Sequence, residues 1–113
     1  MLKFRIDILK DNGVITKDVQ DFMYQVIDYL ADQYSAVTQE QATMFITHLA
    51  MATQRILAGT IAEGMEASIF EEVMKHAGYD NALQVLSYIE QHSVVKYPES
   101  ERQYLVLHLC SMF

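Results

Sequence analysis

The chain of 113 residues has little of what marks several large classes of protein. Its one cysteine, Cys110, cannot form a disulfide within the chain, so nothing indicates an oxidising compartment. One proline and four glycines leave no linker between domains, and the length suits a single domain. No basic start followed by an apolar run opens the chain, and polar residues interrupt every apolar stretch well short of a membrane span. We therefore expect a cytoplasmic protein without a signal peptide or a membrane contact.

Positive charge is also scarce in this sequence. Eight Lys and Arg residues stand against 15 Asp and Glu residues, which gives a formal net charge of −7. The basic residues are spread singly from Lys3 to Arg102, whereas binding to nucleic-acid phosphates requires clustered Lys and Arg. We therefore expect no direct contact with nucleic acid.

What the sequence does contain is helical periodicity. Residues 2–10 fit a short helix or a strand, because their apolar residues satisfy both periods. Thr16 is placed to cap a helix that runs to about Tyr34. The apolar residues of this helix recur at helical spacing, which predicts that they form its buried stripe. These residues are Val19, Phe22, Met23, Val26, Ile27 and Leu30.

Two pairs of residues have the spacing of a capping box, in which a hydroxyl residue is followed three positions later by Glu or Gln. Thr38 and Gln41 predict the start of a helix that ends at residues 57–58. Ser68 and Glu71 predict the start of a shorter helix. Both predictions rest on the side chains that satisfy the free backbone N–H groups of a first helical turn.

Residues that typically begin or end helices also occur in the last third of the chain. Gly78 is suited to close the short helix, and Asp80 to cap a helix that reaches about Gln91. Pro98 suits the first turn of a final helix, because its missing N–H is not needed there. No alternation typical of strands follows the N-terminal segment. The sequence therefore predicts an all-α protein with about five helices after that segment.

Two of the predicted helices each carry one histidine among apolar neighbours. In the segment from Gln41 to Arg55, His48 lies at the border between an apolar arc and a polar arc. Arg55 follows seven positions later, which is two turns along the same line of the helix. A histidine at such a border can be reached by a phosphate donor, and the arginine could extend toward an added phosphate.

The second histidine, His108, lies on a helix that is apolar almost all round. Glu101 precedes it by seven residues and shares its face. A helix of this kind is usually central in a bundle or buried at a subunit contact. Burying Glu101 and His108 there is costly unless each of them finds a partner. A lone histidine on an apolar helix is more often a hydrogen-bonded structural residue than a functional one, and both histidines are open to that interpretation.

The sequence contains few signs of a catalytic or metal centre. No two histidines are spaced three or four residues apart, and no cysteine pair is present. No serine or cysteine lies in a nucleophile elbow, and the Gly-rich signatures of nucleotide binding are missing. A small metal-dependent enzyme would require ligands such as His48, His108 and Glu101 to converge. We expect no enzyme activity, no metal and no cofactor.

Taken together, the two histidine segments resemble the motifs of a known family. The block from His48 to Arg55 resembles the first phosphorylation-site motif of the PTS regulation domain (PRD), in which a histidine and an aliphatic residue begin a helical run that ends in arginine. The block from Glu101 to Leu109 resembles the second motif, a glutamate followed seven residues later by histidine. The resemblance covers residues 14–113 and leaves 1–13 as an N-terminal segment.

The resemblance implies a five-helix bundle of two antiparallel helix pairs, often dimeric through the helices that carry the histidines. It also implies a regulator of sugar catabolism whose histidines are phosphorylated by the histidine phosphocarrier protein or by a sugar permease subunit. On that basis His48 and His108 are the candidate phosphoacceptors, and Arg55 and Glu101 are supporting motif residues. Family members usually carry two copies of the domain behind an RNA-binding or DNA-binding module, whereas this sequence has one copy.

The acidic charge and the single copy together favour action through a partner regulator protein rather than direct control of transcription. The resulting hypothesis is a phosphorylation-sensitive domain that modulates a homodimer or a partner complex. The alternative is a small helical interaction or structural dimer that is not phosphorylated. Two imidazole rings fully enclosed and hydrogen-bonded within one subunit would favour the alternative.

Overall fold

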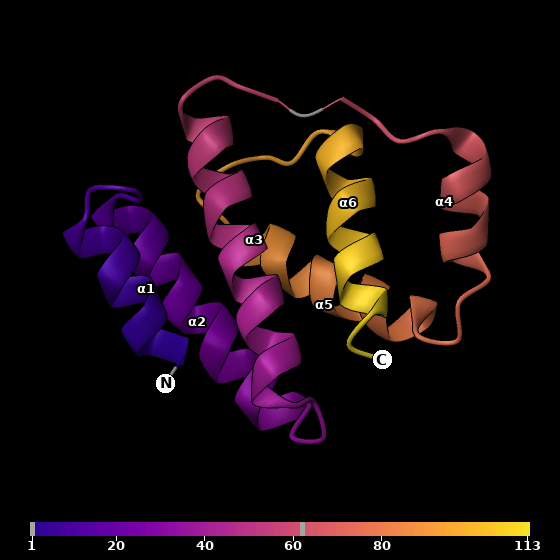
Figure 1. Cartoon of the computed structure of the whole chain (residues 1–113), viewed down its shortest axis with the longest axis horizontal. Helices are drawn as coiled ribbons and strands as arrows, with labels where there is room; N and C mark the ends of the chain where they lie inside the picture. Colours follow the sequence, from indigo (N-terminus) through magenta and orange to yellow (C-terminus); the bar gives the residue numbers. More distant parts are fainter. Residues whose placement is uncertain (1, 62) are drawn as a thin grey trace.

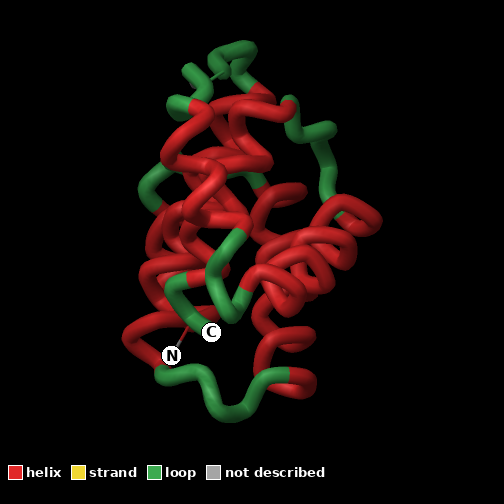
Figure 2. The backbone as a smooth tube through the Cα atoms, turned by 90° about the vertical axis from the view of Figure 1, so that its right-hand side faces the viewer, coloured by secondary structure: helices red, strands yellow, loops and turns green. Residues whose placement is uncertain are grey.

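The computed structural model describes residues 2–61 and 63–113, and this part of the chain forms six α-helices without a strand (Figures 1 and 2). The predicted all-α class is therefore confirmed. In the described residues the five helices predicted after the N-terminal segment are present, and the total is six rather than five because that segment is itself helical. The helices are α1 (Leu2–Asp11), α2 (Lys17–Gln33), α3 (Gln39–Leu57), α4 (Ala67–Met74), α5 (Tyr79–His92) and α6 (Glu99–Cys110).

Burial decides why the first segment is a helix rather than a strand. A strand would place Phe4, Ile6 and Ile8 on one face, yet only Ile6 is buried while Phe4 and Ile8 are 60% and 45% exposed. In the helix, Ile6 shares its inner side with Leu2 and Leu9, which pack against the core. The helical period thus matches the residues that α2 and α3 cover, and the strand period does not.

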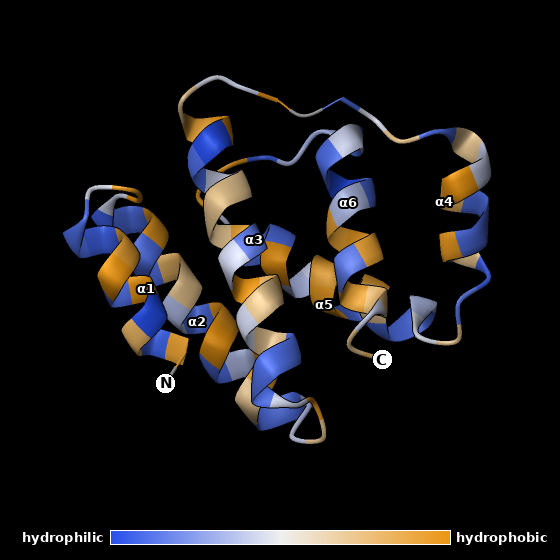
Figure 3. Cartoon of the chain, in the orientation of Figure 1, coloured by the Kyte–Doolittle hydropathy of each residue, from blue (hydrophilic) through white to orange (hydrophobic). Residues whose placement is uncertain are grey.

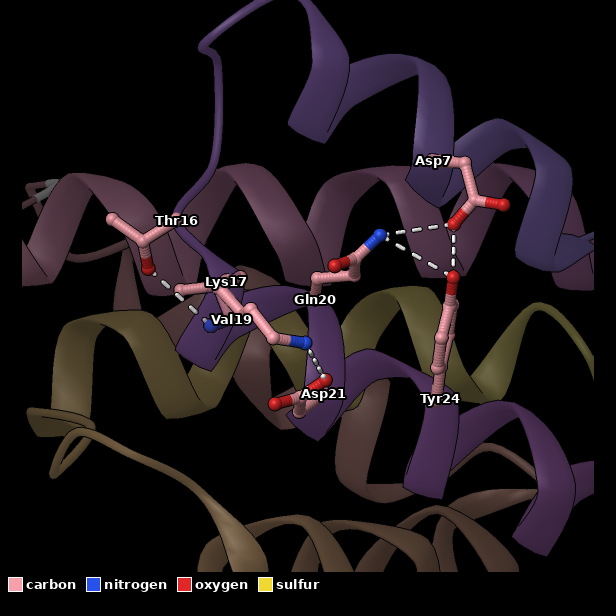
Figure 4. Close-up of polar contacts among 7 residues, drawn as sticks. All are labelled: Asp7, Thr16, Lys17, Val19, Gln20, Asp21 and Tyr24. Carbon is pink, nitrogen blue, oxygen red and sulfur yellow. Dashed lines mark hydrogen bonds and ion pairs between the residues drawn. The ribbon is translucent and has the colours of Figure 1, made fainter.

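Polar contacts also fix α1 to α2 (Figure 4). The side-chain amide of Gln20 donates to Asp7 Oδ1 at 3.0 Å, and the hydroxyl of Tyr24 donates to the same oxygen. The Asp7 carboxylate, with burial, raises the pKa of the Tyr24 hydroxyl, so this group remains a donor at neutral pH. These contacts attach the N-terminal helix to the bundle over its middle turns.

The helix starts follow local capping chemistry in two cases. Thr16 Oγ1 accepts from the backbone N–H of Val19, and Thr38 forms a capping box with Gln41. Both predictions of these caps are confirmed, and α3 ends at Leu57, as expected. All six residues of the predicted α2 stripe are buried.

The predicted caps of the next two helices are wrong. The N-cap of α4 is Glu66 rather than Ser68, and the N-cap of α5 is Gly78 rather than Asp80. A Cβ on Gly78 would lie 2.7 Å from the Cβ of Phe113, so the C-terminus leaves no room for a side chain at this N-cap. The prediction that Gly78 closes the short helix is also wrong, because α4 ends at Met74.

The core lies between α2, α3, α5 and α6. Helix α6 packs against α3, α4 and α5, while α1 packs on the outer side of α2 and α3. Apolar and polar bands alternate around the helices, as expected for helices that bury one side (Figure 3). No helix in the described part of the chain is long and apolar enough to cross a bilayer.

Helices α3 and α6 lie side by side and run in opposite directions (Figure 1). The chain leaves the end of α3 in a long loop that passes over the start of α6, where Gly64 lies next to Ser100. The end of α3 therefore faces the start of α6, and the middle of α3 faces the last turn of α6. This neighbourhood contains the candidate site.

Candidate functional site

The antiparallel arrangement of α3 and α6 brings the four predicted site residues together. His48 and Arg55 lie seven residues apart on α3, and Glu101 and His108 lie seven residues apart on α6. Because the helices run in opposite directions, equal spacing sets His48 opposite His108 and Arg55 opposite Glu101. The spacing shared by the two motifs thus gives two cross-helix pairs in one register.

The two imidazole rings are stacked on each other. Their centroids lie 4.2 Å apart, and the ring planes differ by 11°. His48 is exposed and His108 is half-buried. None of the four nitrogens of the two rings has a hydrogen-bond partner within residues 2–61 and 63–113. Neither ring is fully enclosed.

Burial lowers the pKa of His108, and the neighbouring His48 lowers it further. Both causes disfavour the charged form, because a second positive charge beside His48 would be repelled and poorly solvated. His108 is therefore neutral at pH 7. A neutral imidazole has a free nitrogen lone pair, which is what a nucleophile or a phosphate acceptor requires.

Arg55 and Glu101 form an ion pair two helical turns from the stacked rings. One terminal nitrogen, Arg55 Nη2, lies 2.8 Å from Glu101 Oε1 and 2.9 Å from Glu101 Oε2. The Glu101 side chain is 2% exposed, whereas that of Arg55 is 38% exposed. The expectation that a buried Glu101 requires a partner is thus met by Arg55. Arg55 Nε is buried and has no hydrogen-bond partner in the described structure.

These four residues line one groove between the helices, which we call the α3–α6 groove. Its volume is about 260 Å³. Besides the two pairs, its lining consists of Met51, Ala52, Tyr104 and Leu105. His48, at one end of this groove, is exposed to solvent.

A second hollow adjoins His48 on the side of α1. It measures about 610 Å³ and is lined by residues that include Arg5, Thr47 and His48. Arg5 Nε donates to Thr47 Oγ1 at 2.8 Å, which holds the guanidinium of α1 beside α3. Arg5 could not be predicted as a neighbour of His48, because nothing local in the sequence connects the first helix to that residue.

A further cavity and a possible metal site were the other candidates for a functional site, and neither has suitable residues. A cavity of about 500 Å³ lies between α1, α2 and the loop before α3, but its lining is mainly apolar and Lys3 is its one charged residue. His48, His108 and Glu101 line the same groove, yet no group of three or more His, Cys, Asp or Glu in the described part of the chain is placed to hold a metal ion.

Comparisons with known proteins bear on the same region. A family model described as PRD domain matches residues 20–111, which include both histidines and both ion-pair residues. The chain is also similar to YhfY, an uncharacterized protein of Escherichia coli (strain K12). The two are 26% identical over 113 residues, which cover 99% of this chain and 94% of YhfY. No solved structure matches the chain.

Proposed function

This chain belongs to the PRD domain family, and on that premise we propose that it is a regulatory domain controlled by phosphorylation of His48 and His108. The observation that carries the proposal is the stacked histidine pair in the α3–α6 groove, one ring of which is exposed to solvent. A solvent-exposed ring and a neutral ring lie where a donor protein can approach them. The proposed role is regulatory, in the control of carbohydrate catabolism, and not catalytic.

The proposed donor is a phosphohistidine of the histidine phosphocarrier protein or of a sugar permease subunit. The lone pair of a neutral imidazole nitrogen attacks phosphorus, and the P–N bond to the donor ring breaks. The donor nitrogen keeps the electron pair of that bond, and a proton passes from the acceptor ring to the donor side. A neutral acceptor favours this step, because a protonated ring has no free lone pair.

The added phosphoryl group acts through charge. It brings about −1.5 to −2 charge at neutral pH to a chain with a net charge of −7. Arg55 is the nearest cation of the groove lining, and it already binds Glu101. A phosphate that competes for Arg55 weakens the ion pair that joins α3 to α6. Phosphorylation is thereby linked to the packing of these two helices.

The proposed readout is association with a second copy of the chain or with a regulator protein. The exposed residues Met44, His48 and Met51 on α3 form part of the surface that such a partner would cover. New charge on a desolvated contact can shift an association equilibrium by about tenfold or more. The acidic chain acts on transcription through that partner rather than by binding nucleic acid.

The experiment supplies phosphoenolpyruvate, the general phosphotransferase enzyme and the phosphocarrier protein, with and without a sugar permease subunit. Intact-mass measurement should detect an acid-labile gain that is lost in the double variant His48→Gln/His108→Gln. The matched control His76→Gln/His92→Gln removes the two other histidines of the chain and should retain the gain. No gain from either donor, or a gain that survives in the first double variant, would overturn the proposal.

A further inference from the structure

The stacked histidines are held by parts of the chain that cannot move apart easily. Leu49 and Leu109, the residues that follow His48 and His108, are both 0% exposed and belong to the core. Separating the two backbones would therefore expose core side chains. Rotation of the side chains is the main freedom left to the two rings.

The α3–α6 groove also contains little positive charge that could offset the charge of a phosphoryl group. Within the described part of the chain, Arg55 is the one arginine or lysine that lines it, and Glu101 cancels its charge. One phosphoryl group therefore leaves the groove with about two negative charges at neutral pH. A second group would meet this charge without a further cation in the groove lining, since Arg5 lies in the adjoining hollow and can serve a group on His48 but does not line the groove with His108.

The distance between two such groups is limited by the stacking. With ring centroids 4.2 Å apart, two phosphorus atoms bonded to nitrogens of the stacked rings lie within about 10 Å of each other, even when they point in opposite directions. With the effective dielectric constant of about 20 that is typical near a protein surface, two dianions at this separation repel each other by enough to lower an equilibrium constant at least about tenfold, salt screening included. Partial burial of His108 strengthens the repulsion.

We infer that His48 and His108 act as one acceptor that takes a single phosphoryl group per chain. This inference rests on the proposed function and specifies its stoichiometry. Either ring can receive the group, and the ring that receives it excludes the other. The nitrogen lone pairs lie in the ring planes, and the two planes are nearly parallel. A phosphoryl group on one ring is therefore not in line with a nitrogen of the other, so each ring is charged from outside the chain rather than by its neighbour.

The test uses potassium phosphoramidate, a small reagent that phosphorylates histidine without a protein donor. An imidazole lone pair attacks its phosphorus, the P–N bond of the reagent breaks, and ammonia leaves with the electron pair and a proton from the ring. The starting protein is His76→Gln/His92→Gln, which retains His48 and His108 as its only histidines. Intact mass, followed with time at neutral pH, should rise by one phosphoryl group, with the second added at least about tenfold more slowly.

Two further variants separate exclusion from simple inaccessibility. Adding His48→Gln or His108→Gln to the same background should leave a chain that takes one phosphoryl group in each case, at a rate like that of the first addition. Rapid double addition, no addition, or a single variant that accepts nothing would overturn the inference. Thermal melting of each variant confirms that it is folded before the reaction.

The same protein distinguishes this inference from the proposed function. If phosphoramidate adds one group and the phosphotransferase proteins add none, the stacked pair is a single acceptor and the proposed donor is wrong. If the phosphotransferase proteins add a group to each histidine at similar rates, the proposed function holds and the single-acceptor inference fails.

Discussion

Arg55 on α3 gives one terminal nitrogen to both carboxylate oxygens of Glu101 on α6, at 2.8 and 2.9 Å. This ion pair is the polar counterpart of the histidine stack, and the two pairs join the helices at points two turns apart. A carboxylate that is 2% exposed has lost most of its hydration, so the guanidinium is what offsets its charge. The pair therefore sets the register between α3 and α6 at the site.

The first prediction concerns the stability that this pair provides. Arg55→Met removes the guanidinium from the buried carboxylate of Glu101, and we expect the free energy of unfolding to fall by about 3 kcal/mol. The double variant Arg55→Met/Glu101→Leu should lose much less, because an apolar pair of similar volume needs no charge compensation. Urea denaturation monitored by circular dichroism measures both values.

Arg102 provides the matched control for this prediction. It lies on the same helix and pairs with Glu90 and Glu99, but these ion pairs are far more exposed than Glu101. Arg102→Met should therefore cost less than about 1 kcal/mol. Equal losses in Arg55→Met and Arg102→Met would contradict the role assigned to the buried pair.

The helix face on which each site residue lies could be predicted from the sequence, but the contacts between residues of different helices could not. Helical periodicity placed His48 at a border that is exposed in the structure, and it required a partner for Glu101. The partner itself, Arg55, is 46 residues away in the chain. Periodicity relates residues within one helix, and the contact depends on how two distant helices align. Spacing along α3 alone therefore relates Arg55 to His48, two turns away on its own helix, and not to Glu101 across the groove.

The same limit explains the outcome for the fold. Capping by Thr16 and Thr38 is local, so both helix starts could be predicted from neighbouring residues. Helix α5 begins before the position that Asp80 would cap, and its N-cap Gly78 lies against Phe113, a contact that only the folded chain contains. The resemblance to the PRD family is confirmed by the match over residues 20–111, whereas the N-terminal helix α1 lies before the matched segment.

The second prediction concerns the pH dependence of stability through His108. Its pKa in the folded state lies below the ordinary value of 6.5, so the unfolded chain binds a proton more readily. The contribution of His108 is therefore fully present above pH 6.5 and is lost as the pH falls from 6.5 through the folded-state pKa. Thermal melting between neutral and mildly acidic pH should show a smaller decrease for His108→Gln than for the unmodified chain. Identical decreases would show that neither burial nor the neighbouring His48 lowers the pKa of His108.

The third prediction concerns a hydrogen-bond chain that ties the loop before α6 to α3. Thr53 Oγ1 donates to the backbone oxygen of Leu49 at 2.7 Å, so it accepts from the Tyr97 hydroxyl, also at 2.7 Å. Ser93 Oγ donates to the same Tyr97 oxygen at 3.1 Å. Tyr97 is 3% exposed, and burial raises the pKa of its hydroxyl, which keeps it protonated as a donor. Tyr97→Phe should lower the free energy of unfolding by about 1–2 kcal/mol, as measured by urea denaturation.

A tyrosine without such contacts serves as the control for Tyr97. Tyr79 is half-buried, and its hydroxyl has no hydrogen bond within the described residues. Tyr79→Phe should therefore change stability by less than about 0.5 kcal/mol. If Tyr97→Phe proved as mild as Tyr79→Phe, the hydrogen-bond chain would not stabilise the loop.

The fourth prediction uses Cys110, the one cysteine of the chain, as a reporter of α6 packing. Cys110 is 3% exposed, and burial raises the pKa of its thiol, so little reactive thiolate is present at neutral pH. We expect a thiol reagent such as dithiobis(nitrobenzoate) to react on the order of a hundredfold more slowly with the folded chain than with the chain unfolded in guanidinium chloride. Absorbance measures both rates, and a single cysteine makes the signal unambiguous. His108 lies two residues before Cys110 on α6. If phosphorylation weakens the Arg55–Glu101 pair that joins α6 to α3, the thiol of Cys110 should react faster in the phosphorylated chain. A folded chain that reacts as fast as the unfolded one would show that α6 is not packed as described.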